Sequence, residues 1–160
     1  MNKNDLLAQL TAHLQASARD ARQAMAAAAT EARDGATPAE KREDSRVAIE
    51  QAGLARGQQA RLSRALADLA LLEGFAPPRS ARRIGAGAVV EVENDEVGRT
   101  FFIAPVGAGI ELTGPGGDGY LSVVTPSSPV GRAVMGRQAG DVVEIVAGGE
   151  TREWTVSFVG

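Results

Sequence analysis

The sequence contains no cysteine, a single histidine and few aromatic residues, and each of these shortages excludes a kind of site. Without cysteine the chain forms no disulfide and no thiolate metal site. The lone His13 lies in a polar helical pattern, and a metal site needs several convergent donors, so we interpret it as a solvated surface residue. Aromatic residues make up only 4% of the chain, which is little for an aromatic-lined catalytic pocket.

Long apolar runs are also missing. No segment approaches the roughly 18 apolar residues that cross a bilayer, and no apolar stretch of the signal-peptide kind follows the N-terminus. We therefore expect a cytoplasmic protein with no membrane partner. The formal net charge of −3 over 160 residues indicates neither an acidic tail nor a general nucleic-acid coat.

The first half of the chain favours helix. Residues 6–73 contain one proline, and apolar residues recur there at spacings of three and four. The first run comprises Leu7, Leu10, Leu14, Ala18, Ala21, Met25, Ala28 and Ala32; the second comprises Ala48, Ala52, Ala55, Leu62, Leu66 and Leu69, with Gln59 at the missing position. The pattern predicts two helices of roughly 30 residues, each about 45 Å long.

Turn signals separate the two runs. Gly35 breaks the first helix, Thr37 suits the N-cap of the second, and Pro38 suits its first turn. Glu40 falls where a capping box places its acid. We therefore expect an intramolecular antiparallel coiled-coil hairpin and a monomer, rather than a coiled-coil dimer.

The composition of the apolar seam changes along the predicted hairpin. Alanine prevails near the turn and leucine near the other end. Alanine lets helices approach closely but buries little apolar area, so the turn end should be thin and marginally stable. Gly53 and Gly57 share one helix face, and we expect them to pack closely against the partner helix.

The second half has the pattern of strands. After a short linker that contains Pro77 and Pro78, segments rich in valine and isoleucine are separated by turns. The predicted strands are residues 88–92, 100–106, 109–112, 121–124, 142–146 and 153–159. In the last one Trp154, Val156 and Phe158 alternate with polar residues, which predicts one buried face. A short helix is expected from Pro129 to Met135, with Ser128 as its N-cap.

Ordered motifs in both halves resemble those of the bacterial Gre-type (GreA/GreB) transcript cleavage factors. The run Ser-Pro-Val-Gly-Arg-Ala at residues 128–133, followed by Gly136, Gly140 and Asp141, resembles the most recognisable run of that family. In the first half, residues 31–33 and 50–53 with Gly57 resemble it as well. The similarity covers nearly the whole chain in the family's order.

The resemblance implies an α+β protein: an N-terminal coiled-coil hairpin and a C-terminal FKBP-like α/β domain. We expect the hairpin in residues 1–75 with an acidic tip near 34–44, a linker at 76–83, and the docking domain at 84–160. In the family the globular domain docks on RNA polymerase and the hairpin enters the secondary channel. Tip acids then help hold the second Mg²⁺ of the polymerase, whose own active site cuts backtracked RNA.

This resemblance implies site residues. The candidate tip acids are Asp34, Glu40, Glu43 and Asp44. Glu40 is the first choice and would contact metal only within the polymerase complex, since Mg²⁺ prefers oxygen ligands. The candidate docking residues are Ser127, Ser128, Pro129 and Arg132. The chain would be an accessory factor rather than an enzyme, with no cofactor of its own, and would meet RNA and DNA only through the polymerase.

Two departures from the family leave alternatives open. Thr37 stands where the first tip acid is expected, and the segment between Ala32 and Glu50 is one residue longer than the commonest spacing. The chain can therefore also be interpreted as a non-cleaving regulator that competes for the secondary channel. A third interpretation is an FKBP-like prolyl isomerase. For the tip acids, a solvated helix N-terminus is the simple structural interpretation.

Overall fold

The computed structural model describes residues 2–34, 41–114, 117 and 119–160. In this part of the chain the order of elements is two long helices, four strands, a short helix and two strands. The chain divides into two compact units: one is Ala12–Ala70, and the other combines Met1–Thr11 with Leu71–Gly160. The first turns of the N-terminal helix therefore belong to the same unit as the C-terminal part of the chain.

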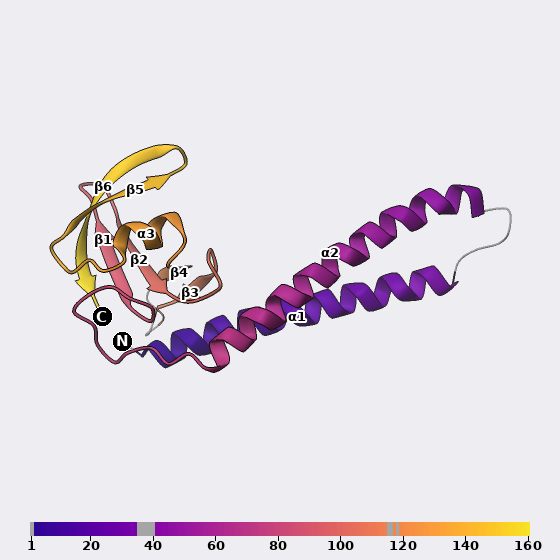
Figure 1. The fold of residues 1–160 in the computed structure, drawn as a ribbon, viewed down its shortest axis with the longest axis horizontal. Coiled ribbons are helices and arrows are strands. Elements are labelled where there is room, and N and C mark those ends of the chain that lie inside the picture. The colour runs from indigo at the N-terminus through magenta and orange to yellow at the C-terminus, as the bar shows by residue number, and fades with distance from the viewer. Residues whose placement is uncertain (1, 35–40, 115–116, 118) are drawn as a thin grey trace. The chain divides into compact units, whose positions relative to one another are not determined.

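The helices α1 (Lys3–Asp34) and α2 (Lys41–Glu73) form the predicted hairpin (Figure 1). Within the unit of residues 12–70, Arg61 Nε donates a hydrogen bond to Ser17 Oγ at 3.1 Å. The turn signals from Gly35 to Glu40 lie outside the described residues. The helical prediction is therefore confirmed for the two arms.

The register of α2 differs from the predicted one. Positions of lower exposure recur at spacings of four and three, at Gln51, Ala55, Gln58, Leu62, Ala65, Leu69 and Leu72, and Asp68 is half-buried beside them. The polar residue between Ala55 and Leu62 in the seam is thus Gln58 and not Gln59, and Leu66 is 42% exposed instead of buried. Leucine, alanine and glutamine occur at adjacent positions, so the sequence left two registers open and packing selected one.

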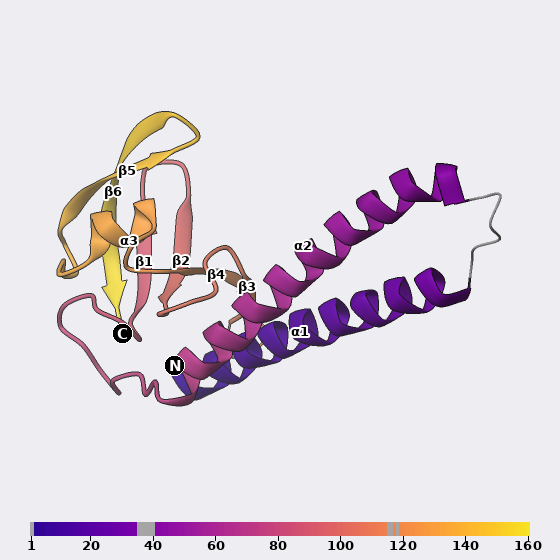
Figure 2. The ribbon, with the colours of Figure 1, turned by 45° about the vertical axis from the view of Figure 1, so that its right-hand side comes forward.

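The expectation for Gly53 and Gly57 is wrong. A Cβ atom added at either residue would meet nothing within 4 Å. Instead of close packing, the structure has a groove of about 400 Å³ between the helices, with Met25, Ala28 and Ala52 among its lining residues. The ribbons of α1 and α2 also diverge toward Asp34 and Lys41 in both views (Figure 1 and Figure 2). Small side chains permit close approach but supply too little contact to enforce it.

The C-terminal strands form one mixed six-stranded sheet, in the order β3-β4-β2-β1-β6-β5. The strands are β1 (Val89–Glu93), β2 (Gly98–Ile103), β3 (Glu111–Thr113), β4 (Tyr120–Val124), β5 (Val142–Ala147) and β6 (Glu150–Val159). β2 and β4 pair in parallel, and the other neighbours are antiparallel. β2 is shorter than predicted because Pro105, two residues beyond its end, cannot donate to a ladder. An α+β fold with a mixed sheet is thus confirmed.

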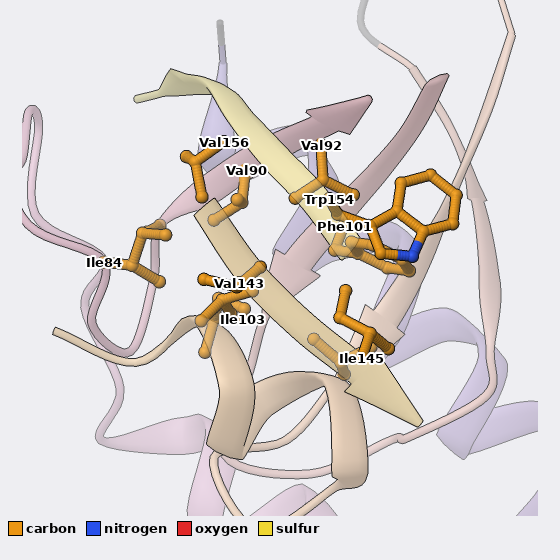
Figure 3. Close-up of a cluster of buried hydrophobic side chains, with 12 residues drawn as sticks. Ile84, Val90, Val92, Phe101, Ile103, Val143, Ile145, Trp154 and Val156 are labelled. Carbon is orange, nitrogen blue, oxygen red and sulfur yellow. The ribbon is translucent and has the colours of Figure 1, made fainter. Parts of the chain in front are cut away.

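The middle strands β1 and β2 of this sheet have buried side chains on both faces. One face carries an apolar cluster covered by α3 (Pro129–Val134), and Figure 3 shows its side chains gathered from β1, β2, β5 and β6. On β2, Phe101 and Ile103 belong to this cluster, while Phe102 is fully buried outside it. Successive side chains of a strand point to opposite faces, so Phe102 lies on the second face.

The first turns of α1 belong to the same unit as the sheet. Leu6 and Leu10 are fully buried, and a Cβ atom on Gly107 would lie 2.6 Å from Leu10 Cδ1. Gln9 pairs with the backbone of the edge strand β3: its Nε2 donates to Thr113 O at 3.0 Å, and its Oε1 accepts from Thr113 N at 2.9 Å. A side-chain amide therefore occupies hydrogen-bonding groups that an edge strand otherwise leaves open.

The alternation expected along β6 fails near its end. Trp154 and Val156 are buried as predicted, but Phe158 is 41% exposed. Val156 pairs with Val92 while Phe158 pairs with the preceding Glu91, so a bulge inserts Ser157 without a partner. A bulge shifts the side-chain phase, which a strict two-residue alternation cannot anticipate. In the described part of the chain, neither long helix has an apolar stretch sufficient to cross a membrane.

Candidate functional site

The segment that leads into α3 is held by the side chain of Ser128. Its backbone is extended, with φ −66° and ψ 158°, and its Oγ accepts a hydrogen bond from Gly131 N at 3.0 Å. The same hydroxyl donates to Thr125 O at 2.8 Å. Pro129 occupies the first turn, where its missing N–H has no cost. The predicted capping role of Ser128 is therefore confirmed.

Gly131 makes this tight entry possible. It is buried, and a Cβ atom there would overlap the carbonyl oxygen of Thr125 and lie 2.8 Å from the Thr125 carbonyl carbon. The Thr125 carbonyl accepts hydrogen bonds from both the backbone N and the Oγ of Ser128. The glycine in the Ser-Pro-Val-Gly run thus lets the incoming loop fold back onto α3.

Three of the candidate docking side chains are presented on the surface. Ser127, Pro129 and Arg132 are exposed, whereas Ser128 is half-buried because its hydroxyl is used within the loop. Ser127 Oγ lies 3.3 Å from Thr125 Oγ. The structure therefore brings the docking candidates together in one exposed segment.

A pocket of about 280 Å³ lies next to this segment, on the face of the sheet that α3 covers. Val130 of α3 lines it, and its apolar floor includes Phe101 and Ile145. Trp154 also lines the pocket, and Figure 3 shows its indole ring beside Phe101 and Ile145. The floor side chains are almost completely buried, so the pocket is an extension of the core that opens to solvent.

Charged side chains from β2 and β6 form the pocket rim. The guanidinium carbon of Arg99 lies 5.8 Å from the centroid of the Trp154 ring, which places a cation over an aromatic face. Arg152 is paired within the protein: it lies 2.9 Å from Glu150 and 3.7 Å from Glu96. Among the described residues, no carboxylate lies within ion-pair distance of Arg99.

The predicted tip acids lie at the ends of the two helices. Asp34 ends α1, and Glu43 and Asp44 fall in the first turn of α2. Glu40 lies outside the described residues. Within the described ranges, no group of three histidine, aspartate or glutamate residues is arranged to hold a metal ion.

Sequence reasoning missed the pocket residues. Arg99 of β2 is far in the sequence from Arg152 and Trp154 of β6, and pairing of β1 with both strands brings them together. The alternation of β6 did indicate that Trp154 points inward, but no local signal linked it to Arg99. Only the order of the strands could have revealed this grouping.

Comparisons with known proteins agree with the motifs around α3. Residues 79–159 match the family model described as transcription elongation factor, GreA/GreB, C-term. No curated protein sequence matches the chain.

Among solved structures, the transcription factor Gfh1 and GreA factor homolog 1 (Gfh1) of Thermus thermophilus are each 18% identical to the chain. Each match covers 96% of this chain and 92% of the other, with a TM-score of 0.41. Gfh1 of Thermus aquaticus is 17% identical over 92% and 91% of the two chains, with a TM-score of 0.38. Because the family model spans half of the sequence, the chain belongs to the GreA/GreB family of transcription elongation factors.

Proposed function

We propose that the protein binds bacterial RNA polymerase, inserts its helical hairpin into the secondary channel, and stimulates or modulates cleavage of backtracked RNA. The observation that carries the proposal is the family membership of residues 79–159 in a chain that begins with a two-helix hairpin. The sheet domain would dock on the polymerase and the helices would present the tip. Such a factor acts in the cytoplasm, where the polymerase is.

Docking would use the exposed segment before and within α3. Pro129 has a fixed φ angle, and Ser127 and Arg132 flank it on the surface, so this segment offers a partner a rigid apolar corner with a cation beside it. Ser128 would act indirectly, because its hydroxyl already holds the loop. Rigid presentation lowers the entropy that binding has to offset.

The tip would contribute carboxylates to chemistry that belongs to the polymerase. Carboxylate oxygens are ligands that Mg²⁺ accepts while it keeps several waters, and Asp34 at the end of α1 with Glu43 and Asp44 in the first turn of α2 would supply them. Glu40 remains the first candidate for contact with the second Mg²⁺. That ion would stabilise the attacking and leaving oxygens of the phosphodiester. The protein itself would hold no resident cofactor and would be an accessory factor acting as a monomer.

A second candidate function follows from Thr37. This residue stands where the family pattern has its first tip acid, and a threonine brings no carboxylate to a metal. In this version the protein occupies the secondary channel without stimulating cleavage and excludes other channel factors. The two versions share docking and insertion, and they differ only in chemistry at the tip.

A stalled, backtracked elongation complex tests the proposal directly. The complex is incubated with Mg²⁺ and wild-type protein, Glu40→Ala, or the control Glu50→Ala, which changes an exposed acid of α2 beyond its first turns. Appearance of 3′ RNA fragments that Glu40→Ala reduces, with binding intact, supports the cleaving version. Binding without fragments, together with loss of cleavage by an added Gre factor, supports the regulator. Failure of the wild-type protein to bind core polymerase overturns both.

A further inference from the structure

Two segments of the sheet unit carry arginines and no acids. Residues 76–87 and 125–140 contain no aspartate or glutamate, although the whole chain has a formal net charge of −3. The arginines of these segments are all exposed, and they are Arg79, Arg82 and Arg83 in the linker, Arg132 in α3, and Arg137 shortly after α3. Both segments therefore bring only positive charge to the surface.

Hydrogen bonds hold the two segments side by side. Ile84 N donates to Arg137 O at 2.8 Å, and Gly136 N donates to Ile84 O at 2.8 Å. Arg83 Nη1 adds a bond to Gly136 O at 2.9 Å. Arg83 and Arg137 thus flank one short backbone pairing, and Arg132 lies about one helical turn before Gly136. We call Arg83, Arg132 and Arg137 the arginine patch.

The linker that leads to the patch is fixed at both ends. Before residues 79–83, Lys3 Nζ donates to Pro78 O at 2.6 Å. The backbone of Gly87, with φ 85°, also lies against this proline, because a Cβ atom there would be 2.7 Å from Pro78 Cδ. After residues 79–83, the buried Ile84 makes the backbone pairing described above. The arginines are thus presented by an anchored segment, which lowers the entropy that binding has to offset.

The protein itself does not neutralise the patch. In the described part of the chain, the ion pairs within 4 Å all involve Arg152, which is not a patch residue. Asp141, the next acid along the chain, is half-buried and accepts a hydrogen bond from Gln138 N at 3.0 Å. A guanidinium has five N–H donors, and Arg83 uses one of them for Gly136 O. Like charges held together repel each other, so a partner with negative charge would relieve this repulsion.

The position and composition of the patch favour a protein partner over a nucleic acid. Arg132 belongs both to the patch and to the docking candidates around Pro129, so a protein that binds there also reaches the patch. The two acid-free segments contain no aromatic residue. Proteins that bind single-stranded nucleic acid stack its bases on aromatic side chains, whereas a carboxylate needs only the fork of N–H donors of a guanidinium.

We infer that the arginine patch binds an acidic segment of the protein on which the domain docks, with one carboxylate on Arg83 and another on Arg137. The inference deepens the proposed function and rests on it, because Arg132 joins the patch to the docking candidates. The linker is then part of the docking surface and not only a connection between the two halves of the chain. Charge complementarity of this kind selects the partner and speeds association, and salt weakens it.

A titration of the full-length protein tests the chemistry of the partner. The probes are a fluorescently labelled, capped peptide rich in glutamate, the same peptide with glutamine in place of glutamate, and a single-stranded oligonucleotide of equal charge. We expect the glutamate peptide to bind at least about fivefold more tightly than the glutamine peptide, and less tightly as NaCl is added. Equal binding of the two peptides, or tighter binding of the oligonucleotide, overturns the inference.

Protein variants locate the contact. The double variant Arg83→Gln/Arg137→Gln removes two charges from the patch. The matched control Arg56→Gln/Arg64→Gln removes two exposed charges from α2. Only the first should weaken binding of the glutamate peptide, about fivefold or more. The single variant Arg137→Glu, which leaves the bond from Arg83 to Gly136 O in place, should weaken it as well. Binding by the patch variants that equals binding by the control overturns the inference.

Core polymerase separates this inference from the proposed function. Wild-type protein that is retained, with retention lost in Arg83→Gln/Arg137→Gln but not in Arg56→Gln/Arg64→Gln, supports both. Equal retention of the three proteins overturns the patch inference and leaves the proposed function standing. If the wild-type protein is not retained, the proposed function fails, and the peptide titration alone decides whether the patch prefers carboxylates.

Discussion

Replacing Gly131 with alanine should distort the loop that leads into α3 and destabilise the sheet unit. The new Cβ atom would overlap the carbonyl oxygen of Thr125 and lie 2.8 Å from the carbonyl carbon. Both are backbone atoms, so no side-chain rotation can remove the overlap. The loop must therefore move away from the helix. That movement would lengthen both hydrogen bonds that the Thr125 carbonyl accepts from Ser128, at 3.0 Å from its N and 2.8 Å from its Oγ.

The cost follows from these two effects. Overpacking a filled site costs about 1–3 kcal/mol, and the weakening of the two hydrogen bonds together costs about 1 kcal/mol more. We expect a loss of roughly 2–4 kcal/mol in the free energy of unfolding. With a urea dependence of about 2 kcal/mol per molar, the midpoint of unfolding should fall by about 1–2 M.

Urea unfolding followed by fluorescence of Trp154 measures this loss in the correct unit, since the chain has no other tryptophan. The matched control is Gly85→Ala, because a Cβ atom at Gly85 meets nothing within 4 Å and its φ is not in the left-handed region. The control should change stability by less than about 1 kcal/mol. Equal midpoints for the two variants would refute the reasoning, because the Thr125 loop would then have moved at no cost.

Three further predictions concern the helices and the N-terminus. Gln58→Met should stabilise the hairpin by about 1–2 kcal/mol, because Oε1 of Gln58 is buried without a hydrogen-bond partner among the described residues. Gln59→Met should have little effect, and the reverse order in thermal circular dichroism would contradict the observed register. Ala52→Leu, which adds apolar surface in the groove, should raise the melting temperature of the helices through about 1 kcal/mol of burial. Ala60→Leu, at an exposed position that does not line the groove, should not. Burial lowers the pKa of Lys3 from its usual 10.5, so the unfolded chain binds this proton more tightly. Relative to Lys3→Met, wild-type stability should therefore rise as the pH increases from the lowered pKa toward 10.5. A constant difference between the two proteins in urea unfolding across that window would contradict this.

The nature of each element could be predicted from the sequence because it depends on neighbours a few residues away. The three-four spacing of leucine and alanine predicted both long helices, and the valine-rich segments between turns predicted all six strands. The Ser128 cap, with Pro129 in the first turn, was equally local, and the structure confirms it. For the tip acids the sequence gives only candidates: Glu40 lies outside the described residues, and its role remains a proposal.

Long-range packing decided the rest. It selected Gln58 over Gln59 for the α2 seam, left a groove where alanines permitted close contact, and shifted the phase of Phe158 through a bulge opposite Glu91. The pocket depends on it as well, since Arg99 meets Trp154 only because β1 pairs with both β2 and β6. Local periodicity fixes which face of an element is apolar. Which residues meet across elements depends on register and strand order, and these are set by the packing of the whole domain.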